Sequence, residues 1–86
     1  MTREEITSKV IDIIKNCLEN KNITITTSSL LVEDLSLDSF AAIMILNDLE
    51  DEFHLTVGDD AFDGFKNVDN IVSLIQNMLN EKEKAG

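Results

Sequence analysis

The stretch DSFAAIMILNDLEDEF, residues 38–53, contains the strongest helical signal in the sequence. Its apolar residues recur at intervals of three and four, which is typical of a helix that buries one face. Asp38 precedes the first apolar residue, where its carboxylate can accept a hydrogen bond from the backbone N–H groups that open a helix. The stretch therefore predicts a helix capped by Asp38. Its expected core stripe contains Ile45, Leu46, Leu49 and Phe53.

Two other long segments carry the same periodicity. The first, over about residues 3–20, opens with Thr2 and with Glu5 three residues later, a capping box. The second is capped by Asn67, and its terminal Lys82 and Lys84 suit the negative end of a helix dipole. The expected core residues of these helices are Ile6, Val10, Ile13, Ile14, Cys17 and Leu18, followed by Val68, Ile71, Leu74, Ile75, Met78 and Leu79.

The segment KNITITTSSLLVEDLSL, residues 21–37, separates the first two helices. Its ITIT alternates weakly, as a strand does, but it has no clear partner strand. We therefore expect a long ordered loop, with Ser28 capping a short turn. A loop of this length inside a small domain is often functional. The side chains expected to enter the core are Ile23, Ile25, Leu30, Leu31, Leu35 and Leu37.

These segments predict an all-α fold for a single domain over residues 1–86. We expect a four-helix bundle with three long helices, one short third helix and a long first loop. The short helix falls in DDAFDGF, residues 59–65, and Gly64 closes it. The tail from about residue 80 is expected to fray.

The distribution of charge limits the classes of partner. The net charge is −10, and no Lys or Arg occurs from Asn22 to Phe65. Such a field repels nucleic acid and anionic membranes and attracts basic protein surfaces, although it also fits a simple solvated face. The single Cys17 lies on an apolar stripe, so we expect a buried structural thiol. No signal-peptide or membrane-spanning run is visible, and we expect a cytoplasmic monomer.

Catalysis by Ser39 is not supported by the sequence. A serine nucleophile needs a base within hydrogen-bonding reach, and the only histidine, His54, lies about 22 Å away along an unbroken helix. A calcium loop starting at Asp59 has Ala61 and Asn70 at positions that need ligands, so no metal site is expected. Ser39 can instead serve as the attachment point of a phosphate-linked group at a helix N-terminus, or it is an ordinary polar residue of a first turn.

The segment EDLSLDSFAAIMILNDLEDEF, residues 33–53, resembles the attachment region of acyl carrier proteins. In that family an Asp-Ser-Leu motif opens the second helix, and acidic residues and a Phe end it. Asp38, Ser39 and Phe40 occupy the motif positions, and LEDEF, residues 49–53, matches the ending. The order of helices and the length of the chain also agree. Phe40 in place of Leu, and a bulky Phe62 where small residues are common, are departures that bear on partners and on cargo.

The resemblance implies that the protein is a carrier and not an enzyme. Ser39 would receive 4′-phosphopantetheine from coenzyme A through a phosphopantetheinyl transferase, and the thiol of the arm would carry acyl groups as thioesters. The acidic helix would dock on basic patches of synthase or acyl-transferring enzymes. The residues implied in docking are Phe40, Ile43 and Met44 as an apolar centre and Asp48 and Asp51 as rim charges, with burial of Ile43 an equal alternative.

The pathway is left open between fatty-acid and polyketide synthesis. A carrier of amino acids, such as a D-alanyl or peptidyl carrier protein, shares the Asp-Ser helix and is an alternative. An unmodified helical interaction module is another, and it would use the acidic surface without any arm.

Overall fold

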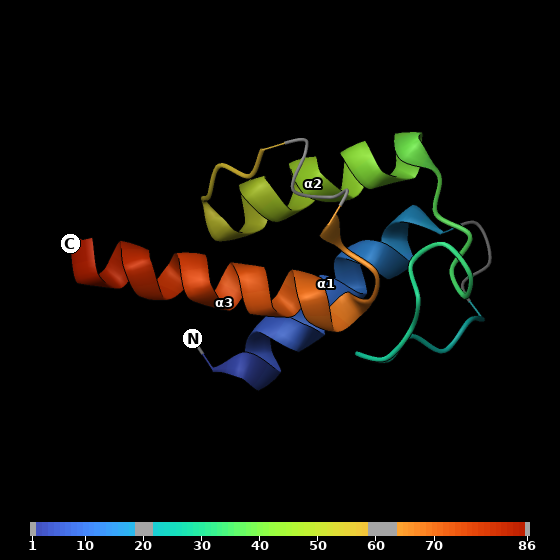
Figure 1. The fold of residues 1–86 in the computed structure, drawn as a ribbon, viewed down its shortest axis with the longest axis horizontal. Coiled ribbons are helices and arrows are strands. Elements are labelled where there is room, and N and C mark those ends of the chain that lie inside the picture. Colours follow the sequence, from blue (N-terminus) through green and yellow to red (C-terminus); the bar gives the residue numbers. More distant parts are fainter. Residues whose placement is uncertain (1, 19–21, 59–63, 86) are drawn as a thin grey trace.

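A computed structural model describes residues 2–18, 22–58 and 64–85, with side chains as far as residue 82. The described residues form three helices, α1 (Arg3–Cys17), α2 (Ser39–Phe53) and α3 (Val68–Ala85). Figure 1 shows that α2 and α3 run in the same general direction and that α1 runs against them. The prediction of an all-helical fold is confirmed. The short third helix falls almost wholly on residues 59–63, which lie outside the described residues.

The beginning of α1 follows the predicted capping box. Thr2 Oγ1 accepts a hydrogen bond from the Glu5 backbone N–H at 3.2 Å, and Glu5 Oε1 accepts one from the Thr2 N–H at 3.4 Å. The predicted end at residue 20 is wrong, because Leu18 has extended backbone (φ −90°, ψ 141°) and ends the helix after Cys17. Cys17 is half-buried on this last turn, and the prediction of a buried thiol is therefore corrected.

The core is formed by one face of each helix together with the loop before α2. Ile13, Leu18, Leu74, Met78 and Leu79 were predicted in the core but are only half-buried. The second half of α3 projects beyond the other helices, which leaves its stripe incompletely covered (Figure 1). The fully or almost fully buried apolar residues include Ile6, Val10, Ile14, Leu31, Leu35, Leu37, Ile45, Leu46, Leu49, Phe53, Val68, Ile71, Val72 and Ile75.

The loop over residues 22–37 is tied by its backbone to the beginning of α3. The N–H of Leu31 donates to the Lys66 carbonyl at 3.0 Å, and the N–H of Val68 donates to the Ser29 carbonyl at 3.1 Å. In the described part of the chain, β pairing is limited to an isolated bridge between Leu30 and Asn67. The expectation of a loop rather than a strand is therefore confirmed.

Three of the six loop residues expected in the core are buried there: Leu31, Leu35 and Leu37. Ile23 and Ile25 are half-buried against the core. The expectation for Leu30 is wrong: its side chain is 37% exposed, because its backbone bridges to Asn67 while the next residue turns inward. The cap of the turn is Ser29 rather than Ser28, since Ser29 Oγ accepts the Thr26 N–H at 2.9 Å.

The loop reverses direction at Ser36, which lies in the left-handed region with φ 54°. Its N–H donates to the Val32 carbonyl, and the N–H of Leu37 donates to the Leu31 carbonyl, both at 3.0 Å. This conformation allows Leu35 and Leu37, on either side of Ser36, to be buried together. A residue with a Cβ atom is disfavoured in the left-handed region.

Side chains also join α3 to the other helices. Arg3 Nη1 of α1 donates to Gln76 Oε1 at 2.8 Å, and Arg3 forms an ion pair with Asp69. Asn67 caps α3 as predicted, with its Oδ1 accepting the Asn70 N–H at 3.0 Å. Lys82 contacts α2 rather than its own helix end, because its Nζ donates to the His54 carbonyl at 3.1 Å. The backbone of α3 is helical to Ala85, whereas fraying was expected from about residue 80.

Replacement of Ser36 by Gly should stabilise the protein. Gly removes the cost of about 1–2 kcal/mol that the left-handed conformation imposes on Ser36. It also gives the unfolded chain more conformational freedom, which destabilises the folded state by about 0.4–1 kcal/mol. The free energy of unfolding should therefore rise by about 0.5–1 kcal/mol. Urea denaturation measures it. Ser28→Gly, at an exposed loop position without positive φ, is the control and should not stabilise. Equal effects of the two variants would contradict the assignment of strain to Ser36.

Candidate functional site

The start of α2 is fixed by the backbone and side chain of Asp38. The residue has extended backbone (φ −98°, ψ −179°), and its Oδ1 accepts the Ala41 N–H at 2.8 Å. Its carbonyl accepts the N–H of Ala42 at 2.9 Å, which begins the helical hydrogen-bond ladder. The predicted N-cap is confirmed. Burial of Leu37 before the cap and of Ala42 after it anchors this turn to the protein.

Ser39 is the first residue of α2, and its side chain is exposed. The N–H groups of a first helical turn and the positive end of the helix dipole favour an anion at this position. A phosphate linked to the Ser39 hydroxyl would face solvent, and first-turn N–H groups that Asp38 does not accept would offset its charge. His54 is exposed at the opposite end of α2, where it takes the left-handed C-cap conformation with φ 54°. It therefore cannot activate the Ser39 hydroxyl within the same chain.

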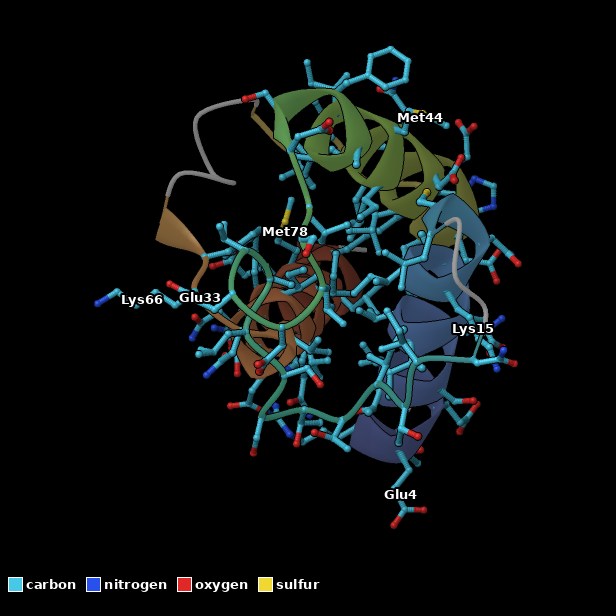
Figure 2. All side chains as sticks on the ribbon, turned by 90° about the vertical axis from the view of Figure 1, so that its right-hand side faces the viewer. Glu4, Lys15, Glu33, Met44, Lys66 and Met78 are labelled. Atoms are coloured by element: carbon cyan, nitrogen blue, oxygen red, sulfur yellow. The ribbon has the colours of Figure 1, made fainter. Side chains whose placement is uncertain are left out.

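An apolar patch continues from Ser39 along the exposed side of α2. We define the patch by Phe40, Ile43 and Met44, whose side chains are 72%, 52% and 42% exposed. Figure 2 shows Met44 on the outer side of α2. Of the two alternatives for Ile43, burial in the core or a place on the surface, the structure shows the surface position. Exposed large apolar side chains that lie together are typical of a contact surface.

The acidic residues at the end of α2 divide into two groups. Glu50 and Glu52 each accept a hydrogen bond from another part of the chain. Glu50 Oε2 accepts the Val57 N–H at 3.1 Å, and Glu52 Oε1 accepts a hydrogen bond from Lys9 Nζ at 2.6 Å. The bond to Lys9 lowers the pKa of Glu52, and the same bond raises the pKa of Lys9. Asp48 and Asp51, which were predicted as rim charges, are exposed.

A groove lies between the end of α1, the loop and the first turns of α2. Its volume is about 490 Å³. Polar groups at its edge come from Cys17, Ser36 and Asp38, and Asp48 Oδ2 lies 3.9 Å from Cys17 Sγ. The groove could not be predicted from the sequence, because no local pattern brings residues of the three segments together. Its large apolar lining consists of Leu18, Ile23, Leu35, Leu37, Phe40 and Met44.

Within the described residues, no group of three or more His, Cys, Asp or Glu side chains could hold a metal ion. The acidic positions at 59, 60 and 63, considered as part of a calcium loop, lie outside the described residues. None of the helices in the described part of the chain is both long and apolar enough to cross a membrane.

Comparisons with known proteins agree with this site. The family described as "Phosphopantetheine attachment site" matches residues 5–75. An acyl carrier protein of Exiguobacterium sibiricum is 33% identical over 92% of this chain and 100% of its own length. One from Thermotoga maritima is 36% identical over 91% of this chain and 96% of its own. A meromycolate extension acyl carrier protein of Mycobacterium leprae is 28% identical over 99% of this chain and 74% of its own.

The chain therefore belongs to the acyl carrier protein family. The domain is one to which 4′-phosphopantetheine is covalently attached. Proteins of this family are carriers and not catalysts.

The cap at Asp38 should contribute measurably to stability. Asp38→Ala removes the acceptor for the Ala41 N–H, and the free energy of unfolding should fall by about 1 kcal/mol. Asp38→Asn keeps an acceptor oxygen and should retain most of this stability. Urea denaturation compares the two variants. An Asp38→Ala protein as stable as the wild type would contradict the role of the cap.

The ion pair between Lys9 and Glu52 predicts a pH effect. Since the pKa of Glu52 is lowered in the folded protein, the pair stabilises the fold above the ordinary Glu pKa, and this contribution is lost as the pH falls through the lowered value. Lys9→Gln should raise the pKa of Glu52, measured by NMR titration of its carboxyl carbon. The control is Lys66→Gln, which removes an exposed lysine that points into solvent (Figure 2). An unchanged pKa in Lys9→Gln would contradict the pairing.

Proposed function

We propose that this protein carries acyl groups in fatty-acid or polyketide synthesis on a 4′-phosphopantetheine attached to Ser39. The observation that supports this most directly is the exposure of Ser39 at the first position of α2, immediately after the capped Asp38. A serine in this position is open to a modifying enzyme, and its backbone is held by a helix start anchored in the core. The membership in the family supplies the identity of the attached group.

The residues around Ser39 have separate roles in this proposal. Ser39 Oγ is the acceptor of the phosphate, and Asp38 holds the first turn so that this oxygen is presented to solvent. The N–H groups of the turn offset the negative charge of the phosphodiester. The base that removes the Ser39 proton comes from the phosphopantetheinyl transferase. As the bond from Ser39 Oγ to phosphorus forms, the pyrophosphate bond of coenzyme A breaks and adenosine 3′,5′-bisphosphate leaves. When attached, the arm supplies a thiol that holds an acyl group as a thioester.

The exposed side of α2 is the proposed docking surface for the transferase and for acyl-transferring enzymes. Its apolar patch of Phe40, Ile43 and Met44 would be covered in the complex. Asp48 and Asp51 would face basic residues of the partner, which speeds association and makes it sensitive to salt. We further propose that the protein acts as a monomer in the cytoplasm.

Attachment at Ser39 can be tested by intact mass. Incubation with coenzyme A and a promiscuous phosphopantetheinyl transferase should add one phosphopantetheine to the wild-type protein and none to Ser39→Ala. The matched control is Ser36→Ala, which removes another exposed serine of the same segment and should leave the modification intact.

Two results would overturn the assignment. Modification of Ser39→Ala would place the arm on another residue. Failure of the wild type with several transferases would favour the unmodified interaction module, in which the acidic surface alone binds a partner.

The role of the rim charges can be tested with the transferase as the docking partner. In the double variant Asp48→Lys, Asp51→Lys, the KM of the transferase for this protein should rise by about tenfold or more at low ionic strength. The increase should shrink at high salt, because salt screens the charges on the partners.

The matched control for this experiment is Glu4→Lys, Asp12→Lys. It makes the same change in net charge at two exposed positions of α1. If both double variants raise the KM equally, the effect comes from net charge and not from docking on α2. An effect of the α2 variant that is the same at low and high salt would contradict electrostatic steering.

A further inference from the structure

The proposed docking surface contains one side chain whose polarity an oxidant can change. We propose that Met44 is an oxidation site: conversion of its thioether to the sulfoxide weakens docking on α2, and reduction of the sulfoxide restores it. The inference rests on the proposed function, because it concerns the regulation of the same surface. It adds a modification site separate from Ser39, and the modifying agent belongs to the class of hydroperoxides.

The first argument is the exposure of the sulfur-bearing side chain. Met44 is 42% exposed and lies on the outer side of α2 (Figure 2). Met78 of α3 is half-buried and points toward the inside of the molecule, and the third methionine, Met1, lies outside the described residues. Oxidation depends on access of the oxidant to the sulfur, so Met44 should react before Met78.

The second argument is the place of Met44 within the apolar patch. Phe40 and Met44 are four residues apart, so they lie on the same side of α2, and the exposed Ile43 stands next to Met44 in the chain. A phenyl ring and an aliphatic chain do not take up oxygen from a hydroperoxide, whereas a thioether does. Met44 is therefore the position at which the apolar character of the patch can be changed.

The chemical step transfers one oxygen atom to the sulfur. A lone pair of the Met44 sulfur attacks one oxygen of the hydroperoxide, an S–O bond forms and the O–O bond breaks. The proton of the attacked OH group passes to the leaving oxygen, which departs as an alcohol, or as water when the oxidant is hydrogen peroxide. The sulfur loses two electrons and the peroxide gains them. Methionine sulfoxide reductases return the sulfoxide to the thioether, so the modification is reversible.

The sulfoxide opposes docking because it places a polar group in a surface that loses its water in the complex. Its oxygen accepts hydrogen bonds from water while the protein is free, and an acceptor that is buried without a donor costs free energy. The Met44 side chain is exposed, so its oxidation leaves the packing of the core unchanged. Oxidation should therefore weaken docking without unfolding the protein.

A second sulfur atom lies close to this surface. Cys17 is half-buried, lines the same groove as Met44, and has its Sγ 3.9 Å from Asp48 Oδ2. Hydroperoxides also oxidise thiols. Dithiothreitol reverses the sulfenic acid and the disulfide of a cysteine but leaves a methionine sulfoxide intact. Treatment with this reagent after the oxidation therefore removes the reversible products of Cys17 before docking is measured.

The experiment uses the full chain before the arm is attached. The protein is treated with increasing hydrogen peroxide and then with dithiothreitol, and peptide mass spectrometry locates the added oxygen. The KM and kcat of a phosphopantetheinyl transferase are then measured with coenzyme A. One oxygen should appear first on Met44, and the KM should rise by about fivefold or more with little change in kcat. Methionine sulfoxide reductases for both epimers should restore the mass and the KM.

Two variants separate Met44 from the other sulfur atoms. Met44→Leu keeps Met1, Cys17 and Met78, so the KM of this variant should be the same before and after peroxide. Met78→Leu keeps Met44, so its KM should rise on oxidation as that of the wild type does. The amide NMR spectrum of each oxidised protein confirms that it is folded.

Four results would overturn the proposal. They are oxidation of Met78 before Met44, a Met44 sulfoxide that leaves the KM unchanged, an equal rise of the KM in oxidised Met44→Leu, and a KM that stays high after the sulfoxide is reduced. Failure of the untreated protein to gain the arm would be seen separately by intact mass. It would overturn the attachment to Ser39 and, with it, the docking that this inference regulates.

Discussion

The burial of Leu35 and Leu37 on either side of Ser36 is the constraint on which the functional end of the molecule depends. Two leucines separated by one residue can both enter the core here because Ser36 takes a left-handed conformation and turns its own side chain outward. The second leucine immediately precedes Asp38, so the cap of α2 is held against the core. Ser39 is consequently exposed at a helix start whose neighbours Leu37 and Ala42 are buried in the core.

Contacts with the rest of the chain explain how α2 remains stable although its end is acidic. Glu50 and Glu52 bind other parts of the same chain: Glu50 binds the backbone that follows α2, and the exposed Glu52 binds Lys9 of α1. Lys82 of α3 adds a cation at the carbonyl end of α2, where the helix dipole is negative. Asp48 and Asp51 are exposed on the side of α2 that carries the apolar patch, and they are the acids that we propose for docking.

Features set by local chemistry were predictable from the sequence, and features set by distant contacts were not. The capping box at Thr2, the cap at Asp38 and the core stripe of α2 follow from neighbouring residues alone, and so does the surface position of Ser39. Leu30 and Leu31 are both leucines, so their side chains do not tell which one is buried. The backbone bridge from Leu30 to Asn67 decides which one is exposed. No residue type at or beside Ser36 marks it as a left-handed position. The groove forms only where three segments that are separate in the sequence come together. The family resemblance points to the serine as the attachment residue, but it does not predict the groove beside it.

The central claim is that one residue, Ser39, links this fold to its function. Fragmentation mass spectrometry of the modified wild-type protein tests that claim most directly, because it locates the phosphopantetheine on the chain. If the arm is attached to Ser39, fragments containing Ser39 carry the added mass and those ending at Asp38 do not. Added mass on Ser36, or on any residue outside the start of α2, would contradict it.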